Sequence, residues 1–205
     1  MLTQEEVVRQ LEDFILAEHN LLSVGNIPFE HHGKIEKGYP YIRASNASLL
    51  NAFQVVEGAL GKPLNEAQFL EIGCGIGTKC ELARQTGMSA TGVDLLAEYV
   101  ALARRVYPLC SFVHANALEL DYCTFDIVYY HVPFFGDELV RELEQRLLQQ
   151  LPLGSMLIVT RISDWLVGML QAPQQNDRFQ QISTNVDLGR LKLLRKISGA
   201  FSISC

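Results

Sequence analysis

Hydrophobic residues recur at helical spacing in two stretches near the N-terminus. The first stretch predicts a helix that runs to about residue 18, and the second predicts a helix over 46–60. Their hydrophobic faces consist of Val7, Leu11, Phe14 and Ile15, and of Leu49, Phe53, Val56 and Leu60. Residues 20–44 between the helices contain scattered glycine and proline and are expected to be irregular. We therefore expect residues 1–62 to form a helical cap or lid.

From residue 67 onwards, short hydrophobic runs alternate with amphipathic stretches. The runs predict strands at 68–73, 89–94, 110–114, 125–130 and 155–160, and the stretches predict helices at 77–86, 96–106 and 137–150. Such alternation is typical of a parallel sheet with helices on both faces. After a short helix near 163–170, segments 178–184 and 190–197 are expected to pair as an antiparallel edge. Residues 63–205 are the predicted second domain.

A glycine-rich segment, Phe69-Leu-Glu-Ile-Gly-Cys-Gly-Ile-Gly-Thr78, joins the first of these strands to the first helix. Gly73 permits a tight turn, and Gly75 lets a ligand approach the backbone closely. The helix that follows Gly77 directs its unpaired N–H groups toward that ligand. In doubly wound sheets, ligands bind beyond the carboxyl ends of the strands. The segment therefore predicts a nucleotide or cofactor site.

Three cofactor patterns compete for this segment. A dinucleotide loop, G-x-G-x-x-G, requires a third glycine where Thr78 stands. A P-loop matches at Lys79, but Thr78 replaces its second glycine and Cys80 replaces its hydroxyl residue. The third pattern, E-x-G-x-G-x-G, matches in full at Glu71, Gly73, Gly75 and Gly77.

With this third pattern, residues 66–160 resemble the class I S-adenosylmethionine-dependent methyltransferases. The resemblance implies a Rossmann-like α/β three-layer sandwich, with a mostly parallel seven-stranded sheet whose last strand is antiparallel. It also implies S-adenosylmethionine as cofactor. Glu71 then stands where the family holds the cofactor's ammonium group, which suits the acceptor chemistry of a carboxylate.

Further cofactor contacts follow from the same resemblance. Asp94 ends the second strand, where the family binds both ribose hydroxyls; its alternative role is to cap the helix 96–106. Asn116 and Ala117 stand where the family contacts the adenine, although Asn116 also suits an ordinary polar turn. Cys74 and Leu95, beside these motifs, are expected to contact the cofactor as well.

The chemistry is expected after the fourth strand, at His131-Val-Pro-Phe134. Amino-methylating members of the family have N-P-P-[YF] there, and only the last two residues match, so we assign no adenine or glutamine methylation. His131 is a candidate general base, with a structural histidine at a strand end as its alternative. Tyr130 and Phe134 are expected to line the sulfonium or the acceptor, with core packing as their alternative.

The loop of the predicted lid supplies further candidates. Tyr41 and Arg43 are candidate contacts for the acceptor, unless this loop is simply solvated. The adjacent His31 and His32 lack the spacing and neighbours of a metal site, so no metal is expected.

Composition narrows the choice of partners. Of the 205 residues, 48% are hydrophobic and 20% charged, which is typical of a globular protein. The net charge of −6 and the lack of a basic run disfavour a nucleic-acid partner. No hydrophobic run is long enough to span a membrane, and no signal peptide is evident. The five cysteines form no C-x-x-C pair, so we expect reduced thiols in a cytoplasmic protein.

Together these features predict a methyltransferase that acts by direct displacement on an unidentified small-molecule acceptor. Two alternatives remain open at this point. One is a nicotinamide-dependent oxidoreductase, and the other is a sensor or partner protein that binds S-adenosylmethionine without turnover.

Overall fold

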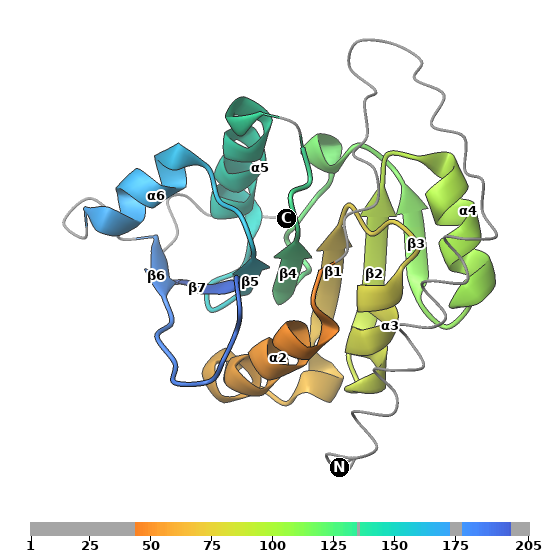
Figure 1. Cartoon of the computed structure of the whole chain (residues 1–205), viewed down its shortest axis with the longest axis horizontal. Helices are drawn as coiled ribbons and strands as arrows, with labels where there is room; N and C mark the ends of the chain where they lie inside the picture. The colour runs from red at the N-terminus through yellow and green to blue at the C-terminus, as the bar shows by residue number, and fades with distance from the viewer. Residues whose placement is uncertain (1–43, 135, 173–177, 198–205) are drawn as a thin grey trace.

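The computed structural model describes residues 44–134, 136–172 and 178–197. Seven strands form one sheet (Figure 1). They are β1 (Gln68–Ile72), β2 (Ser89–Asp94), β3 (Ser111–His114), β4 (Ile127–Tyr130), β5 (Met156–Val159), β6 (Phe179–Gln181) and β7 (Lys192–Lys196). The helices are α2 (Asn46–Leu60), η1 (Leu64–Glu66), α3 (Thr78–Gln85), α4 (Ala97–Val106), η2 (Ala117–Glu119), α5 (Asp137–Gln150) and α6 (Asp164–Gln171).

The strand order in the sheet is β3-β2-β1-β4-β5-β7-β6. Strands β1 to β5 all run parallel to one another, whereas β7 lies antiparallel between β5 and β6. The expected seven-stranded, mostly parallel sheet is confirmed, as is the antiparallel pairing of the last two segments. The antiparallel β7 distinguishes this order from the 3-2-1-4-5-6 order of dinucleotide-binding folds.

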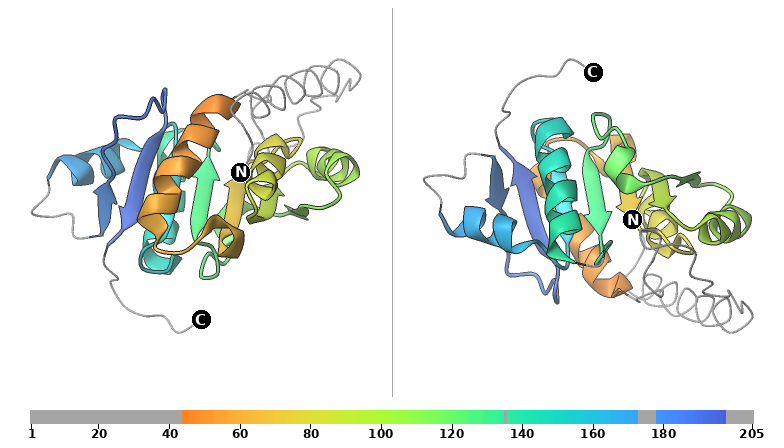
Figure 2. Two further views of the ribbon diagram at one scale, coloured as in Figure 1. Left: turned by 90° about the horizontal axis from the view of Figure 1, so that it is seen from below. Right: turned by 90° about the horizontal axis from the view of Figure 1, so that it is seen from above.

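Helices cover both faces of the sheet (Figure 2). Side chains of α2, α3 and α4 share one buried cluster with one face of the strands, and those of α5 and α6 share a second cluster with the other face. The four residues of β4 are all buried and alternate between the two clusters. A central parallel strand is hydrophobic on both sides for this reason.

Helix α2 has the bounds that the sequence predicts. Ser45 caps its first turn, and Gly61 ends it in a left-handed conformation. Its apolar face packs on the sheet, where the Phe53 ring meets the Phe69 ring edge to face with centroids 5.6 Å apart. Residues 1–43, with the first predicted helix, Tyr41 and Arg43, lie outside the described residues. The division of the chain at residues 62 and 63 stays a prediction.

Two further expectations concern membrane spans and thiols. In the part of the chain that the structure describes, no helix combines the length and the hydrophobicity that a membrane span needs. Cys74, Cys80 and Cys110 are free thiols, as expected. Cys123 is disulfide-bonded, so the expectation of reduced thiols is wrong at this residue.

Candidate functional site

The glycine loop, residues 73–77, turns sharply at the carboxyl end of β1. Gly73, Gly75 and Gly77 all have positive φ angles, of 71°, 51° and 83°, which glycine adopts without steric cost. The backbone N–H groups of Gly73 and Cys74 both donate to the carbonyl of Val93, at 2.9 and 3.0 Å. The loop is therefore fixed to the end of β2 by backbone hydrogen bonds.

Glu71 lies on β1, two residues before the loop, and is only 5% exposed. Its Oε2 accepts hydrogen bonds from the Cys80 backbone N–H at 3.2 Å and from the Cys80 thiol at 3.3 Å. Burial raises the pKa of Glu71 well above its usual value, although the nearby positive charge of Lys79 offsets part of the effect. A cationic ligand would favour the ionised carboxylate here.

Asp94 ends β2 and braces the same loop. Its Oδ2 accepts from the Gly75 N–H at 2.8 Å, and its Oδ1 accepts from the Leu96 N–H at 2.9 Å. The N-cap of α4 is Leu96, which has no side-chain capping bond, so the alternative role of Asp94 as that helix cap is wrong. Glu71 pairs with Gly92 of β2, two residues before Asp94, and the negative charge of Asp94 adds to the rise in the pKa of Glu71.

Of the other two residues predicted to contact the cofactor beside these motifs, Leu95 has an exposed side chain and Cys74 has a buried one. Leu95 is 39% exposed beside Asp94, so its side chain is available to cover a planar ring. The Cys74 side chain is 2% exposed and packs against β2. It lies so close to Gly92 that a Cβ added there would be 2.8 Å from the Cys74 Cβ. Only the backbone of Cys74 therefore belongs to the loop surface.

Asn116 and Ala117 follow β3. The Asn116 Oδ1 accepts from the Leu118 N–H at 3.0 Å and its Nδ2 donates to Glu119 at 3.2 Å, so the side chain caps η2. Ala117 is buried in the cluster on the α5 side of the sheet. Contacts of these two residues with an adenine stay a prediction.

His131 leaves the end of β4 next to the loop. Its Nδ1 lies 2.6 Å from the Thr160 Oγ1, and its Nε2, also buried, has no hydrogen-bond partner within the described residues. Burial, followed by the positive charge of Lys79, lowers the pKa of His131. The imidazole is therefore held neutral near pH 7, with one nitrogen fixed and the other unused.

Tyr130 and Phe134, on either side of this turn, pack on the α5 side of the sheet. Tyr130 is fully buried, and its hydroxyl donates to the Glu144 Oε1 at 3.0 Å. Tyr130 thus takes the core position noted as its alternative, and the structure does not bring its hydroxyl to the glycine loop. Phe134 is half-buried against the same cluster.

Sequence reasoning missed three features of this site. Val132 has a φ of 49°, and a β-branched residue in this region is a true outlier of the kind that gathers at functional sites. Thr160, which holds His131, follows β5 and has no signature of its own in the sequence. Lys79 is buried at the start of α3, where its only signal was the incomplete P-loop pattern.

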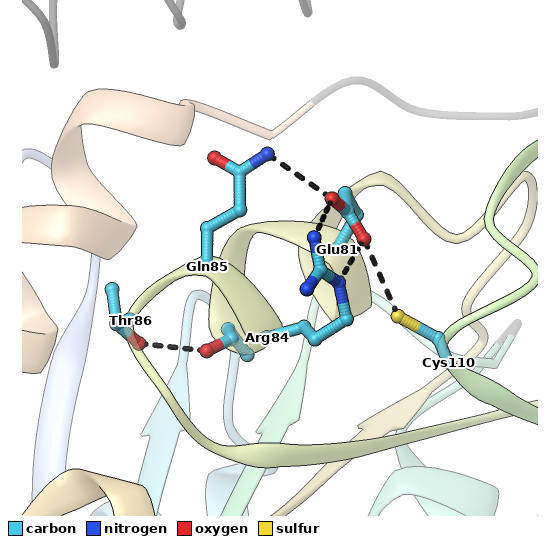
Figure 3. Close-up of polar contacts among 6 residues, drawn as sticks. Glu81, Arg84, Gln85, Thr86 and Cys110 are labelled. Atoms are coloured by element: carbon cyan, nitrogen blue, oxygen red, sulfur yellow. Dashed lines mark hydrogen bonds and ion pairs between the residues drawn. The ribbon is translucent and has the colours of Figure 1, made fainter.

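The body of α3 is fixed by a separate group of contacts around Glu81 (Figure 3). Arg84 donates two hydrogen bonds of 2.7 Å to the Glu81 carboxylate, and Gln85 donates one of 3.1 Å. The Cys110 thiol, just before β3, lies 3.7 Å from the same carboxylate. These contacts tie α3 to the neighbouring part of the sheet and so steady its first turn at the loop.

The described residues contain no group of three or more His, Cys, Asp or Glu side chains that could hold a metal ion. The donors that are present fit S-adenosylmethionine instead. A buried carboxylate suits its ammonium group, a second carboxylate suits its ribose hydroxyls, and a loop with little side-chain bulk admits it between them.

Comparisons with known proteins agree with this assignment. Residues 69–151 match the family model described as a methyltransferase domain. No curated protein matches the sequence. Among solved structures, an RNA methyltransferase from Salinibacter ruber in complex with S-adenosyl-L-homocysteine has a TM-score of 0.56 at 16% identity, over 80% of this chain and 98% of that one.

Two further structures share the fold. A TehB-like SAM-dependent methyltransferase from Corynebacterium glutamicum has a TM-score of 0.51 at 13% identity, over 92% of this chain and 98% of that one. The plantazolicin methyltransferase BpumL in complex with SAH has a TM-score of 0.55 at 14% identity, over 75% and 83%. The matched domain, the sheet order and the loop between Glu71 and Asp94 agree: residues 69–151 resemble a methyltransferase domain, and the chain has the fold of S-adenosylmethionine-dependent methyltransferases.

Proposed function

We propose that the protein transfers the methyl group of S-adenosylmethionine to a small-molecule nucleophile by direct displacement. The choice of cofactor rests on one observation. Glu71 and Asp94 lie near the carboxyl ends of adjacent parallel strands, with the glycine loop between them. Each Asp94 oxygen accepts one backbone N–H and has a second lone pair for a ribose hydroxyl. When bound, S-adenosylmethionine supplies an electrophilic methyl group on a sulfonium.

On the acceptor side, we assign His131 as the general base. When its Nδ1 donates to the Thr160 hydroxyl, its Nε2 is a neutral acceptor for a proton. The lowered pKa keeps His131 in this form near pH 7, because both burial and the Lys79 charge disfavour the imidazolium. A hydroxyl, thiol or ammonium acceptor can lose its proton to such a nitrogen as it attacks.

The charge of the chain supports a small acceptor. With a net charge of −6, the protein has no general attraction for a phosphate backbone. The names of the structural neighbours do not decide the question, because one is an RNA methyltransferase and another a plantazolicin methyltransferase. The oxidoreductase alternative loses support, since β7 is antiparallel and Thr78 occupies the place of the third glycine.

A transfer assay tests the proposal directly. The full chain is incubated with S-adenosylmethionine carrying a radioactive methyl group, and with either a small-metabolite extract or total RNA. We expect label in the small-metabolite fraction, none in RNA, and none in either with Asp94→Ala. Label in RNA alone would refute the small-molecule acceptor. Cofactor binding without transfer to any pool would indicate a binding protein rather than an enzyme.

A further inference from the structure

His131 and Thr160 occupy equivalent places on two neighbouring strands. Tyr130 of β4 and Val159 of β5 form the last pair of their ladder, so His131 and Thr160 are the first residues beyond it. Their side chains meet there, with 2.6 Å between the imidazole Nδ1 and the hydroxyl Oγ1. After this contact the two segments lead into different helices, α5 and α6. The contact is therefore made where backbone pairing no longer holds the two strands together.

The far end of the segment that carries Thr160 is held by Glu144 of α5, a fully buried carboxylate that the proposed reaction does not use. The Glu144 Oε1 accepts from the Ser163 backbone N–H at 2.9 Å, and its Oε2 accepts from the Ser163 hydroxyl. The same Oε1 accepts from the Tyr130 hydroxyl at 3.0 Å. The segment is thus fixed at both ends, by the ladder before Thr160 and by Glu144 after it.

The placing of Glu144 goes beyond what the start of α6 requires. The two bonds to Ser163 would suffice to hold that helix, whereas the bond to Tyr130 reaches the residue directly before His131. A hydrophobic side chain in place of Glu144 would avoid the cost of burying a charge. It would also leave the Tyr130 hydroxyl and the Ser163 N–H without their acceptor. One carboxylate therefore links the segments on which His131 and Thr160 lie.

The position of Thr160 bears on the tautomer of His131. A neutral imidazole has one N–H and one acceptor nitrogen, and the hydrogen bond that one nitrogen makes decides which is which. The Nε2 is buried and has no hydrogen-bond partner within the described residues. With the proton on Nδ1, donated to Thr160, the Nε2 lone pair is ready to take a proton. With the proton on Nε2, a buried N–H is left without an acceptor.

We propose that Glu144 is a positioning residue that holds Thr160 against His131, and that Thr160 in turn keeps the imidazole proton on Nδ1. This proposal rests on the proposed function, in which Nε2 takes the proton of the methyl acceptor. Both residues act through His131. The rival role for Glu144 is to fix only the start of α6, where the Ser163 hydroxyl accepts from the Leu166 N–H at 3.2 Å. In that role its replacement would leave the tautomer of His131 unchanged.

Nuclear magnetic resonance of the full chain tests the role of Thr160. Long-range ¹H–¹⁵N spectra at about pH 8, where histidine is neutral, report which ring nitrogen carries the proton. The chain has five histidines, and the signal of His131 is the one that is lost in His131→Gln. We expect the Nδ1–H tautomer to predominate. In Thr160→Val, its ratio to the Nε2–H tautomer should fall by about threefold to tenfold, as for one lost hydrogen bond between neutral groups. Thr160→Ser, which keeps the hydroxyl, should restore the ratio.

A second set of variants tests Glu144. Glu144→Met removes the acceptor of three hydrogen bonds and should lower the tautomer ratio by about twofold to fivefold, because the Thr160 hydroxyl remains but is less well placed. Glu144→Gln keeps one oxygen and can donate to the Ser163 hydroxyl, so it should keep the ratio. Tyr122→Phe is the matched control, since it also loses a buried hydroxyl bond, to the Ala117 carbonyl between β3 and β4. It should lower stability and leave the ratio unchanged.

Three results would overturn the proposal. They are a wild-type His131 with its proton mainly on Nε2, an unchanged ratio in Thr160→Val, and an unchanged ratio in Glu144→Met. If Glu144→Met does not fold, Ser163→Ala takes its place, because it removes the hydroxyl bond to Glu144 and keeps the backbone bond. The spectra need no methyl acceptor, so their result is independent of the transfer assay that tests the proposed function.

Discussion

Replacement of Asp94 by alanine tests whether this carboxylate binds ligand or only braces the loop. The wild-type side chain accepts two backbone hydrogen bonds, from Gly75 at 2.8 Å and from Leu96 at 2.9 Å. Hydrogen bonds to charged groups contribute about 1.5–3 kcal/mol each. Asp94 is half-buried, so water can replace part of both bonds in the variant. We therefore expect the free energy of unfolding to fall by about 1–3 kcal/mol.

Ligand binding should weaken in addition. Loss of the acceptor for two ribose hydroxyls is worth about 1–3 kcal/mol, which raises the Kd for S-adenosylhomocysteine by about fivefold to 150-fold. Urea unfolding measures the first quantity and isothermal titration calorimetry the second. Both measurements belong at a temperature where the variant is fully folded, so that lost affinity does not reflect unfolded protein.

Asp126→Ala is the matched control for this experiment. The Asp126 carboxylate also accepts a backbone hydrogen bond, from the Gln68 N–H at 2.8 Å, and it pairs with Lys62. It lies at the amino end of β1, whereas the glycine loop lies at the carboxyl end of the same strand. This variant should lose stability and keep its affinity. The reasoning fails if Asp94→Ala loses stability while its Kd stays equal to that of the wild type.

Two further predictions concern the loop and the histidine. Gly77→Ala should lower the free energy of unfolding, measured in urea, more than Gly61→Ala does. The two glycines have nearly the same backbone angles, so the strain of a left-handed alanine is similar at both. Only at Gly77 would the new Cβ approach a ring carbon of Phe112, at 2.5 Å. Equal losses would contradict this steric argument. Because the pKa of His131 is lowered, the unfolded chain binds more protons there, so this group's contribution to stability is present above pH 6.5 and is lost as the pH falls through the lowered value. Unfolding at pH 7.5 and 5.5 should therefore show a smaller loss on acidification for His131→Gln than for the wild type, and an equal loss would count against it.

The sequence predicts those parts of the fold whose residue pattern is compatible with a single local structure. A hydrophobic strand followed by a glycine turn and a helix places Glu71 and the loop correctly, and hydrophobic spacing gives α2 its observed bounds. The fate of Tyr130 could not be predicted in the same way. In a strand buried on both faces every residue is hydrophobic, so the pattern does not show which side chains point to which face.

Contacts between distant segments explain the other omissions. Lys79 is placed by Asn46, 33 residues earlier in the chain, and His131 by Thr160, 29 residues later. Neither pair belongs to a motif, and each forms only once the helices and strands have packed. A lysine or a threonine at a helix start or strand end is ordinary in a sequence. Such a residue points to a functional site only once the structure shows that its side chain is buried.

The register of the sheet explains how His131 is held against the glycine loop. Ile72 of β1 pairs with Tyr130 of β4, so the next residues, Gly73 and His131, leave the sheet side by side. A Cβ on Gly73 would lie 3.9 Å from the Cα of Pro133, which shows that the two turns are in contact. Val132, which lies between His131 and Pro133, has a left-handed backbone that costs about 1–3 kcal/mol. The contacts that fix His131 and Pro133 offset this strain. The distance from His131 to the glycine loop is therefore set by paired strands rather than by a free loop, as the proposed displacement, which depends on alignment, requires.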